Sequence, residues 1–218
     1  IGAGPGGYTA AAEAARRGRK VALCEYDRLG GTCLNRGCIP TKTLLHTTEL
    51  LRQTREHGGT LGLAGTLSLD GAALARRVTE VSVSLGNGVA TLLKKHRVTL
   101  AEGHAVVTAP GTVTVGGRVL TAPAILIAAG SMPARPPIPG AALPGVLTSD
   151  DLLADAGRHY ERLIILGGGV IGMELASVYA ARGTRVTVLE ALDRPLANFD
   201  REISQNLKMI LKKRGADI

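Results

Sequence analysis

The sequence predicts an α/β protein, and composition and spacing together favour that class. The chain has 218 residues, of which 45% are hydrophobic and 29 are glycine, a composition that suits a compact α/β fold with a substantial core. A Gly-x-Gly-x-x-Gly spacing also occurs twice, each time just before a stretch with helical character. The six glycines are Gly2, Gly4 and Gly7 in the first copy and Gly167, Gly169 and Gly172 in the second.

The first glycine copy opens a predicted helix and strand. An alanine-rich helix is expected over residues 9–17, and Gly18 breaks it. An apolar strand then follows over residues 20–24 and ends at Glu25. The first copy is therefore a glycine loop, a helix and a strand with an acid at its end.

The second glycine copy has the same organisation. A buried strand is predicted over residues 163–166, a helix extends to Arg182, and a second strand over residues 186–189 ends at Glu190. Adding 165 to each residue number of the first copy gives the glycines, the helix break and the terminal acid of the second. The chain therefore contains two βαβ fragments in register.

Each position of this pattern has a physical reason in a dinucleotide site. The first glycine permits a tight turn, the second lets the backbone approach a pyrophosphate, and the third lets the helix pack on the strand. The helix N-terminus binds the phosphates, and Glu25 or Glu190 accepts hydrogen bonds from ribose hydroxyls. A 2′-phosphate would be repelled by Glu190, although Arg185 and Arg194 are nearby cations in the sequence. The sequence thus predicts two Rossmann-like dinucleotide-binding domains.

The segment between the two copies is predicted to add helices and short strands. Residues 41–57 show helical periodicity, and residues 70–96 predict a longer helix that is interrupted near residues 86–88. Residues 98–120 predict short strands joined by glycine turns. The first domain is therefore expected to carry a small β-meander.

A domain boundary is expected soon after a further strand. The continuous apolar run at residues 124–128 predicts a buried parallel strand, and the proline-rich residues 133–144 predict a linker. We therefore expect a first dinucleotide-binding domain at residues 1–145, with a truncated first strand, and an incomplete second one at residues 146–218.

Two cysteines five positions apart predict redox chemistry. Cys33 and Cys38 lie between the pair Gly30 and Gly31 and a proline, Pro40, that suits the first turn of a helix. Cys38 would then lie at the positive end of the helix dipole, where a thiolate is stabilised. A turn of this length can bring two cysteines within disulfide distance, so the pair is predicted to be a redox-active disulfide.

Two other uses of a cysteine pair stay open. A structural disulfide requires an oxidising compartment, and a zinc site requires two further ligands at suitable spacing. The third cysteine, Cys24, lies inside a predicted strand and is expected to be a small buried apolar residue.

The cysteine segment resembles a known active site. Residues 30–42, with the wording Leu-Asn-x-Gly-Cys-Ile-Pro-Thr-Lys, resemble the flavin-dependent disulfide reductases, the class I pyridine nucleotide-disulfide oxidoreductases, and are most similar to the dihydrolipoamide dehydrogenases. The resemblance implies FAD at the first glycine copy and NAD at the second. It also implies that Cys33 is the interchange thiol and Cys38 the charge-transfer thiol beside the flavin. A lysine near the flavin N5, here Lys42, would pair with Glu174.

The same resemblance implies further cofactor contacts. Residues 129–133 are similar to the Ala-Thr-Gly-Ser-x-Pro segment of the flavin domain, with Ala129 where threonine is usual. Backbone groups supply much of the binding in that segment, so the change affects one side-chain contact. The additional cofactor-binding positions implied are Gly31, Thr32, Ala105, Ala129, Gly130 and Ser131.

The resemblance also implies an activity and its partners. Such an enzyme oxidises protein-bound dihydrolipoamide and passes electrons to NAD, works with the lipoyl domain of a 2-oxoacid dehydrogenase or glycine cleavage complex, and forms a homodimer. Its acid/base histidine and carboxylate belong to a C-terminal interface domain, and none of the five histidines of this chain matches that motif. Two alternatives stay open: a mercuric or glutathione-type reductase that uses NADPH, and a nucleotide-binding fragment without turnover.

The charge and the termini of the chain limit the partners and the location that we expect for it. The net charge of +8 comes from scattered basic residues with few aromatic residues between them, so neither a nucleic acid nor a membrane is an expected partner, and no metal site is expected. The chain has no apolar run of membrane-spanning length and no signal segment, and a cytoplasmic protein is expected. It begins without Met, and residues 215–218 resemble a turn into a further strand, so we expect a fragment.

Overall fold

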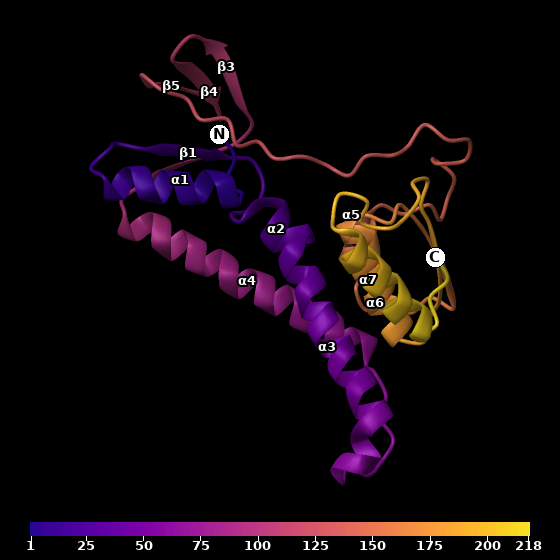
Figure 1. The fold of residues 1–218 in the computed structure, drawn as a ribbon. Coiled ribbons are helices and arrows are strands. Elements are labelled where there is room, and N and C mark those ends of the chain that lie inside the picture. The colour runs from indigo at the N-terminus through magenta and orange to yellow at the C-terminus, as the bar shows by residue number, and fades with distance from the viewer. The chain divides into compact units, whose positions relative to one another are not determined.

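The computed structural model describes residues 1–218, which fold into helices and short strands (Figure 1). The helices are α1 Pro5–Arg16, α2 Gly31–Arg36, α3 Cys38–His57, α4 Gly71–Lys95, α5 Ser149–Ala154, α6 Val170–Ala181 and α7 Arg201–Lys213, with a 3₁₀ turn at Gly58–Leu61. The strands are β1 Ala22–Glu25, β2 Thr99–Glu102, β3 Ala105–Ala109, β4 Thr112–Val115, β5 Arg118–Thr121, β6 Arg162–Leu166 and β7 Arg185–Leu189.

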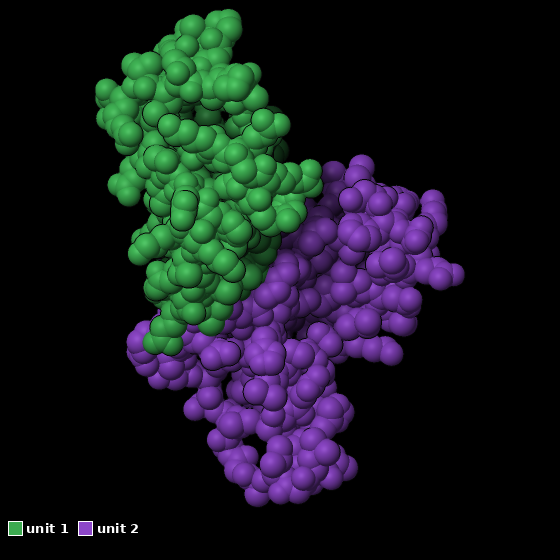
Figure 2. Space-filling view, turned by 90° about the vertical axis from the view of Figure 1, so that its left-hand side faces the viewer, with its two compact units in different colours: residues 1–40, 79–154 green, residues 41–78, 155–218 purple.

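The chain forms two compact units (Figure 2). The first contains residues 1–40 and 79–154, and the second contains residues 41–78 and 155–218. The bounds of these compact units differ from those of the two predicted dinucleotide-binding domains. The predicted domain boundary at residue 145 therefore stays a prediction.

The first unit contains a parallel strand pair and a separate meander. Strands β1 and β2 pair in parallel from Ala22 opposite Thr99 to Glu25 opposite Glu102, and α1 lies along β1 (Figure 1). Strands β3, β4 and β5 form an antiparallel sheet in that order. The expected short strands after residue 98 are therefore confirmed. Buried Cys24 packs in a small core with residues of β2 and β4, as expected for an apolar cysteine.

The second unit contains the other parallel pair. Strand β6 pairs in register with β7, and α6 packs against both strands. After α7 the chain returns to the sheet, where the N–H of Asp217 donates to the carbonyl of Val186 at 2.9 Å and the N–H of Val188 donates to the carbonyl of Asp217 at 2.8 Å. The expected return to a strand position after residue 215 is confirmed. The α/β class is confirmed as well.

The two glycine copies have the same local structure. Gly2 has a φ of +92° and Gly167 a φ of +105°, and each donates its N–H at 2.8 Å to the last residues of the following strand, Cys24 and Leu189. Helices α1 and α6 both begin after a glycine with a φ of −70°. The offset of 165 residues is therefore a structural repeat as well as a sequence repeat.

Helix α4 corrects one expectation. It continues without interruption through Gly86 and Gly88. Each glycine in a helix interior costs about 1 kcal/mol, but the buried stripe of Ser82, Val89 and Leu93 continues across them. Packing of this stripe outweighs the local preference of the glycines, so the predicted break near residue 86 is wrong.

The segment at residues 124–128 corrects another expectation. It is neither a regular strand nor buried, since Leu126 is 58% exposed and Ile127 is 68% exposed. Its hydrogen bonds to a neighbouring segment are with Ile1, whose amino group donates to the carbonyl of Leu126 and whose carbonyl accepts from Ala128, both at 2.8 Å. The run therefore forms no strand ladder. No helix of the chain has both the length and the apolar character needed to span a membrane.

Candidate active site and nucleotide loops

The first glycine loop leaves no room for a side chain at Gly2 or Gly7. A Cβ at Gly7 would lie 1.7 Å from the carbonyl oxygen of Gly2, and a Cβ at Gly2 would lie 2.3 Å from the carbonyl oxygen of Ala128. Helix α1 begins after Gly4 without a capping side chain and without an acid in its first turn. Its first N–H groups are therefore available to an anion, which fits the pyrophosphate of a dinucleotide.

Glu25 lies beside this loop. Its Oε2 accepts from the N–H of Ala3 at 2.7 Å, and its Oε1 accepts from the N–H groups of Tyr26 at 2.8 Å and Asp27 at 2.9 Å. These three bonds fix the carboxylate and leave about one lone pair, on Oε2, for a ribose hydroxyl. The carboxylate therefore fits the role that the sequence predicts for it.

An aromatic pair that sequence reasoning missed flanks Glu25. The rings of Tyr26 and His104 stack with centroids 4.4 Å apart and an interplanar angle of 16°. Tyr26 directly follows β1, and His104 follows Gly103, whose N–H donates to the carbonyl of Glu25 at 2.8 Å. Both residues follow the carboxyl ends of the paired strands β1 and β2, where ligands bind in parallel sheets, but the sequence analysis did not predict this pairing. The pair is a candidate surface for an adenine ring.

The other cofactor positions of the first unit lie along two segments. Ala105 opens β3, directly after His104, while Ala129, Gly130 and Ser131 are exposed and follow the residue that packs on Gly2. The structure thus brings the segment at 129–131 to the glycine loop. Cofactor contacts from these residues stay a prediction.

The cysteine segment packs directly on the first glycine loop. A Cβ at Gly31 would lie 2.6 Å from the Cα of Gly4, and the N–H of Gly30 donates to the carbonyl of Ala3 at 2.9 Å. Gly30 and Gly31 have φ values of +95° and +57°, so both positions favour glycine. Thr32 is exposed and lies in α2 directly after this contact.

Cys33 and Cys38 lie close together at the junction of two helices. Cys33 is half-buried in α2, and Cys38 is exposed at the first position of the 20-residue helix α3. Gly37 separates α2 from α3, and a Cβ at Gly37 would lie 3.5 Å from the Cα of Cys33. The side-chain N–H₂ of Asn35 donates to the carbonyl of Gly31 at 2.9 Å and holds α2 in place. Cys38 therefore begins a helix, as expected.

Lys42 pairs with Glu174 within the second unit. The Nζ of Lys42 in α3 donates to Oε1 of Glu174 in α6 at 2.8 Å, with the lysine side chain 56% exposed and the glutamate 25% exposed. The structure thus brings together the two residues that the family resemblance pairs. Their part in catalysis stays a prediction.

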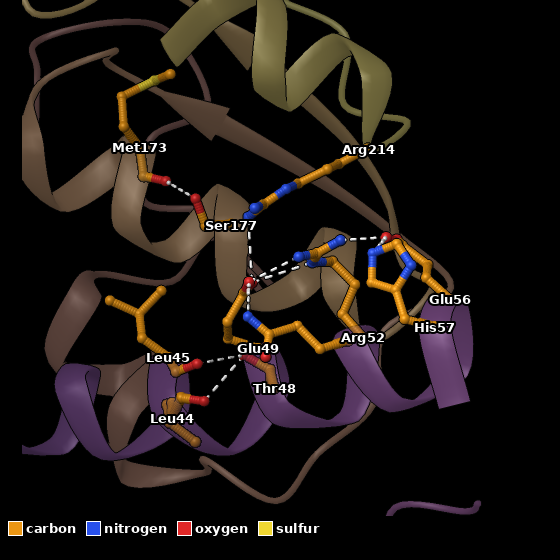
Figure 3. Close-up of polar contacts among 11 residues, drawn as sticks. Leu44, Leu45, Thr48, Glu49, Arg52, Glu56, His57, Met173, Ser177 and Arg214 are labelled. Atoms are coloured by element: carbon orange, nitrogen blue, oxygen red, sulfur yellow. Dashed lines mark hydrogen bonds and ion pairs between the residues drawn. The ribbon is translucent and has the colours of Figure 1, made fainter. Parts of the chain in front are cut away.

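Ion pairs fix the helix that carries Lys42 (Figure 3). The guanidinium of Arg52 donates to both carboxylate oxygens of Glu49, at 2.7 and 3.1 Å, and also pairs with Glu56. Arg214 at the end of α7 lies 3.4 Å from Oε2 of Glu49. Hydrogen bonds from Arg52 lower the pKa of Glu49 to about 2. Helices α3 and α7 are therefore tied together by a charged cluster.

The second glycine loop repeats the geometry of the first. A Cβ at Gly172 would lie 2.1 Å from the carbonyl oxygen of Gly167, while a Cβ at Gly169 would meet no atom within 4 Å. Helix α6 begins without a capping side chain or an acid in its first turn. The open space at Gly169 and the available N–H groups fit a second pyrophosphate.

Glu190 has the place of Glu25 in this second loop. Its Oε2 accepts from the N–H of Gly168 at 2.6 Å, and its Oε1 accepts from the N–H of Leu192 at 2.9 Å. Backbone N–H donors, that of Leu192 first, lower the pKa of Glu190 below its usual range, so the carboxylate is ionised at neutral pH. Arg185 begins β7 at the end opposite Glu190, so it is not a neighbour of this carboxylate.

The histidines lie at the surface, as expected. His46, His57, His104 and His159 are exposed and His96 is half-buried. The stack of His104 on Tyr26 is the one arrangement among them that suggests a binding role.

A chain with two glycine loops, each with a terminal acid, and a cysteine pair against the first loop belongs to a defined class of protein. The chain belongs to the pyridine nucleotide-disulphide oxidoreductase family, whose match extends over residues 1–218. The cofactors of this family are FAD and a pyridine nucleotide, which is consistent with two glycine loops. This match confirms that residues 30–42 resemble the flavin-dependent disulfide reductases because the chain belongs to that family.

Individual relatives narrow the comparison. The chain is 37% identical over 224 residues to the dihydrolipoyl dehydrogenase of Acholeplasma laidlawii, with 100% of this chain and 66% of the relative covered. It is 41% identical over 228 residues to dihydrolipoyl dehydrogenase 3 of Pseudomonas aeruginosa, with 99% of this chain and 47% of the relative covered. Among solved structures, the HOCl-induced flavoprotein disulfide reductase RclA from Escherichia coli matches with a TM-score of 0.84 and 35% identity, with 100% of this chain and 47% of RclA covered. The chain thus spans about half to two thirds of the length of these relatives.

Proposed function

We propose that the protein to which this chain belongs is a flavoprotein disulfide oxidoreductase of the dihydrolipoyl dehydrogenase kind. The main observation that supports this proposal is the contact between Gly31 and Gly4. A Cβ at Gly31 would lie 2.6 Å from the Cα of Gly4. This contact places the segment of Cys33 and Cys38 directly on a loop that fits a dinucleotide pyrophosphate. A dithiol beside a flavin site supports electron exchange between a substrate dithiol and the cofactor.

The first loop with Glu25 would hold FAD, and the second loop with Glu190 would hold NAD. Bound FAD supplies the two-electron exchange between the disulfide and the nicotinamide. Cys38, the first residue of α3, would be the thiol released when the disulfide opens. Glu174 holds the ammonium group of Lys42 in one orientation.

The proposed reaction balances over the cysteine pair. A thiolate of dihydrolipoamide attacks Cys33, the Cys33–Cys38 bond breaks, and Cys38 leaves as the thiolate. The second substrate thiol then displaces Cys33, which leaves oxidised lipoamide and a reduced cysteine pair. The reduced cysteine pair would then lose two electrons, which pass to NAD⁺, and this loss re-forms the Cys33–Cys38 disulfide. Overall, about one proton is released for each NADH formed.

The proposed partners follow from the substrate. The natural substrate would be the lipoyl domain of a 2-oxoacid dehydrogenase or glycine cleavage complex, and the enzyme would be a homodimer. The names of the Acholeplasma and Pseudomonas relatives support this substrate class. The name of RclA supports a second candidate, a reductase that takes electrons from NADPH or NADH to another disulfide or oxidant.

Turnover of the purified holoenzyme tests the proposal. We expect NAD⁺-dependent oxidation of dihydrolipoamide that is abolished by Cys33→Ser and by Cys38→Ser. Cys24→Ala is the matched control, since Cys24 is buried away from solvent and should leave turnover within twofold. Thiol alkylation should label two more cysteines after reduction in the wild type than in the oxidised protein.

Two results would contradict the proposal. Retained turnover in either cysteine variant would remove the redox disulfide from the reaction. Turnover with NADPH and oxidised glutathione or another acceptor, but none with dihydrolipoamide, would favour the second candidate.

A further inference from the structure

The loop after β7 carries a second carboxylate close to Glu190. Glu190 accepts from the N–H of Leu192, and Asp193 is the next residue. The loop folds back on the glycine turn, because the N–H of Leu196 donates to the carbonyl of Gly168 at 2.8 Å. Asp193 therefore belongs to a short turn that is anchored to the second glycine loop at both ends.

Packing at Gly168 shows how tightly this turn is held. A Cβ at Gly168 would lie 3.1 Å from Oε2 of Glu190 and 3.2 Å from the Cα of Pro195. Residues between Glu190 and Pro195 therefore have little freedom to move away from the glycine loop. The turn therefore stays beside the loop that is proposed to bind the dinucleotide.

Two arginines converge on Asp193. The Nη1 of Arg194 lies 3.2 and 3.1 Å from the two carboxylate oxygens, and the Nη2 of Arg201 lies 3.8 Å from Oδ2. Arg194 is further held by its Nη2, which donates to the carbonyl of Ala197 at 2.8 Å. The Arg194 side chain is 23% exposed, and its Nε is buried without a hydrogen-bond partner. Asp193 thus pairs with two guanidinium groups, that of Arg194 in the turn and that of Arg201, the first residue of α7.

We infer that Asp193 is a second specificity-determining residue of the dinucleotide site, which masks Arg194 and Arg201 and so prevents them from attracting a 2′-phosphate. This inference rests on the proposed function, in which the second loop binds NAD. Glu190 repels a 2′-phosphate directly, since it accepts hydrogen bonds from the ribose hydroxyl that the phosphate would replace. Asp193 acts by keeping the local charge balanced.

The alternative role for Asp193 is a surface ion pair that only stabilises the turn. Asp193 is 61% exposed and Arg201 is 73% exposed, and exposed pairs contribute little to stability. A stabilising role would lower the melting temperature in a variant and leave ligand preference unchanged. A masking role changes ligand preference with little effect on melting.

Binding of redox-silent ligands separates these roles. ADP-ribose and its 2′-phosphate share the adenosine and pyrophosphate of the two cofactors and transfer no electrons, so calorimetry on the holoenzyme measures affinity alone. Asp193→Asn should improve the affinity for the 2′-phosphate relative to ADP-ribose by about fivefold at low salt, the effect of one unmasked charge on a divalent group nearby. The double variant with Glu190→Gln should improve this ratio further.

Salt and a matched variant serve as controls. The gain should disappear in about 1 M salt, where the screening length is about 3 Å. Asp200→Asn removes an exposed carboxylate from the same loop, and that carboxylate caps no helix N–H and has no arginine partner. In Asp200→Asn, the ratio of the affinity for the 2′-phosphate to the affinity for ADP-ribose should change by less than about twofold.

The outcomes are distinct. An unchanged ratio in Asp193→Asn, or an equal gain in Asp200→Asn, would overturn the masking role while the dinucleotide site stands. A wild-type holoenzyme that binds neither ligand would overturn the proposed NAD site and the inference together.

Discussion

Two alanine substitutions in the second glycine loop should separate folding from cofactor binding. At Gly172 a Cβ would lie 2.1 Å from the carbonyl oxygen of Gly167 and 3.3 Å from Cγ2 of Ile165, so backbone must move by more than an ångström. Overpacking of this kind costs about 1–3 kcal/mol, and the gain in helix propensity of up to about 1 kcal/mol offsets only part of it. Gly172→Ala should therefore lower the melting temperature by several degrees, about 2–4 °C per kcal/mol.

Gly169→Ala should have the opposite pattern. Its φ of −70° suits alanine, and a Cβ would meet no atom within 4 Å. We expect a loss of stability of only about 0.5 kcal/mol, because alanine is a poorer N-cap than glycine. The methyl group would fill the space that the pyrophosphate needs, so affinity for ADP-ribose should fall by about tenfold or more.

Thermal unfolding and calorimetric titration check both variants in one preparation. Unimpaired ligand binding by Gly169→Ala would show that this loop does not hold the pyrophosphate. Wild-type stability of Gly172→Ala would show that the close approach to Gly167 is wrong. The first copy gives an independent repeat, with Gly4→Ala and Gly7→Ala and with FAD retention as the binding measurement.

Three further variants test other parts of the structure. Glu49→Gln should lower the free energy of unfolding by about 1 kcal/mol at pH 7, because the fall of the Glu49 pKa to about 2 corresponds to about 3 kcal/mol and solvent screens this side chain, which is 36% exposed. In urea unfolding, the difference from wild type should persist above about pH 4.5 and vanish as the pH falls through about 2. A difference that is the same at every pH would contradict the ion-pair origin. Tyr26→Ala should weaken FAD retention on ultrafiltration by about tenfold or more through loss of the surface shared with His104, and unchanged retention would refute the adenine role. Gly88→Ala should raise the free energy of unfolding by about 1 kcal/mol, because Gly88 is helical with open space at its Cβ, and a loss of stability would contradict the continuous helix α4.

Local patterns predicted the repeating scaffold because each position has one dominant physical requirement. A Cβ at Gly7 or Gly172 would collide with the first glycine of its own loop, so the glycine spacing by itself specifies the turn. Cys38 was placed correctly at a helix start because Pro40 and the preceding glycine favour that position. Such requirements involve residues close in sequence, which a single sequence displays.

The misses depend on partners distant in sequence. The break at Gly86 was predicted from local propensity, but the buried stripe through Val89 decides the helix. The strand at residues 124–128 was predicted from its apolar run, but this run is mostly exposed and hydrogen-bonds only to Ile1, which is distant in sequence. The stack of Tyr26 on His104 joins two residues far apart in sequence, and only the pairing of β1 with β2 brings them together.

The two copies of the repeat differ in the loop that closes over the glycine turn, and this difference separates their chemistry. In the first copy the N–H of Gly30 donates to the carbonyl of Ala3, and in the second the N–H of Leu196 donates to the carbonyl of Gly168. Glycine in the first loop permits backbone contact, which brings the cysteine segment onto the dinucleotide turn. In the second copy the corresponding contact comes from Leu196, which is buried and adopts a φ of +51°. In the proposed function, one scaffold would therefore provide a site for electron exchange in the first copy and a site for choice of nucleotide in the second.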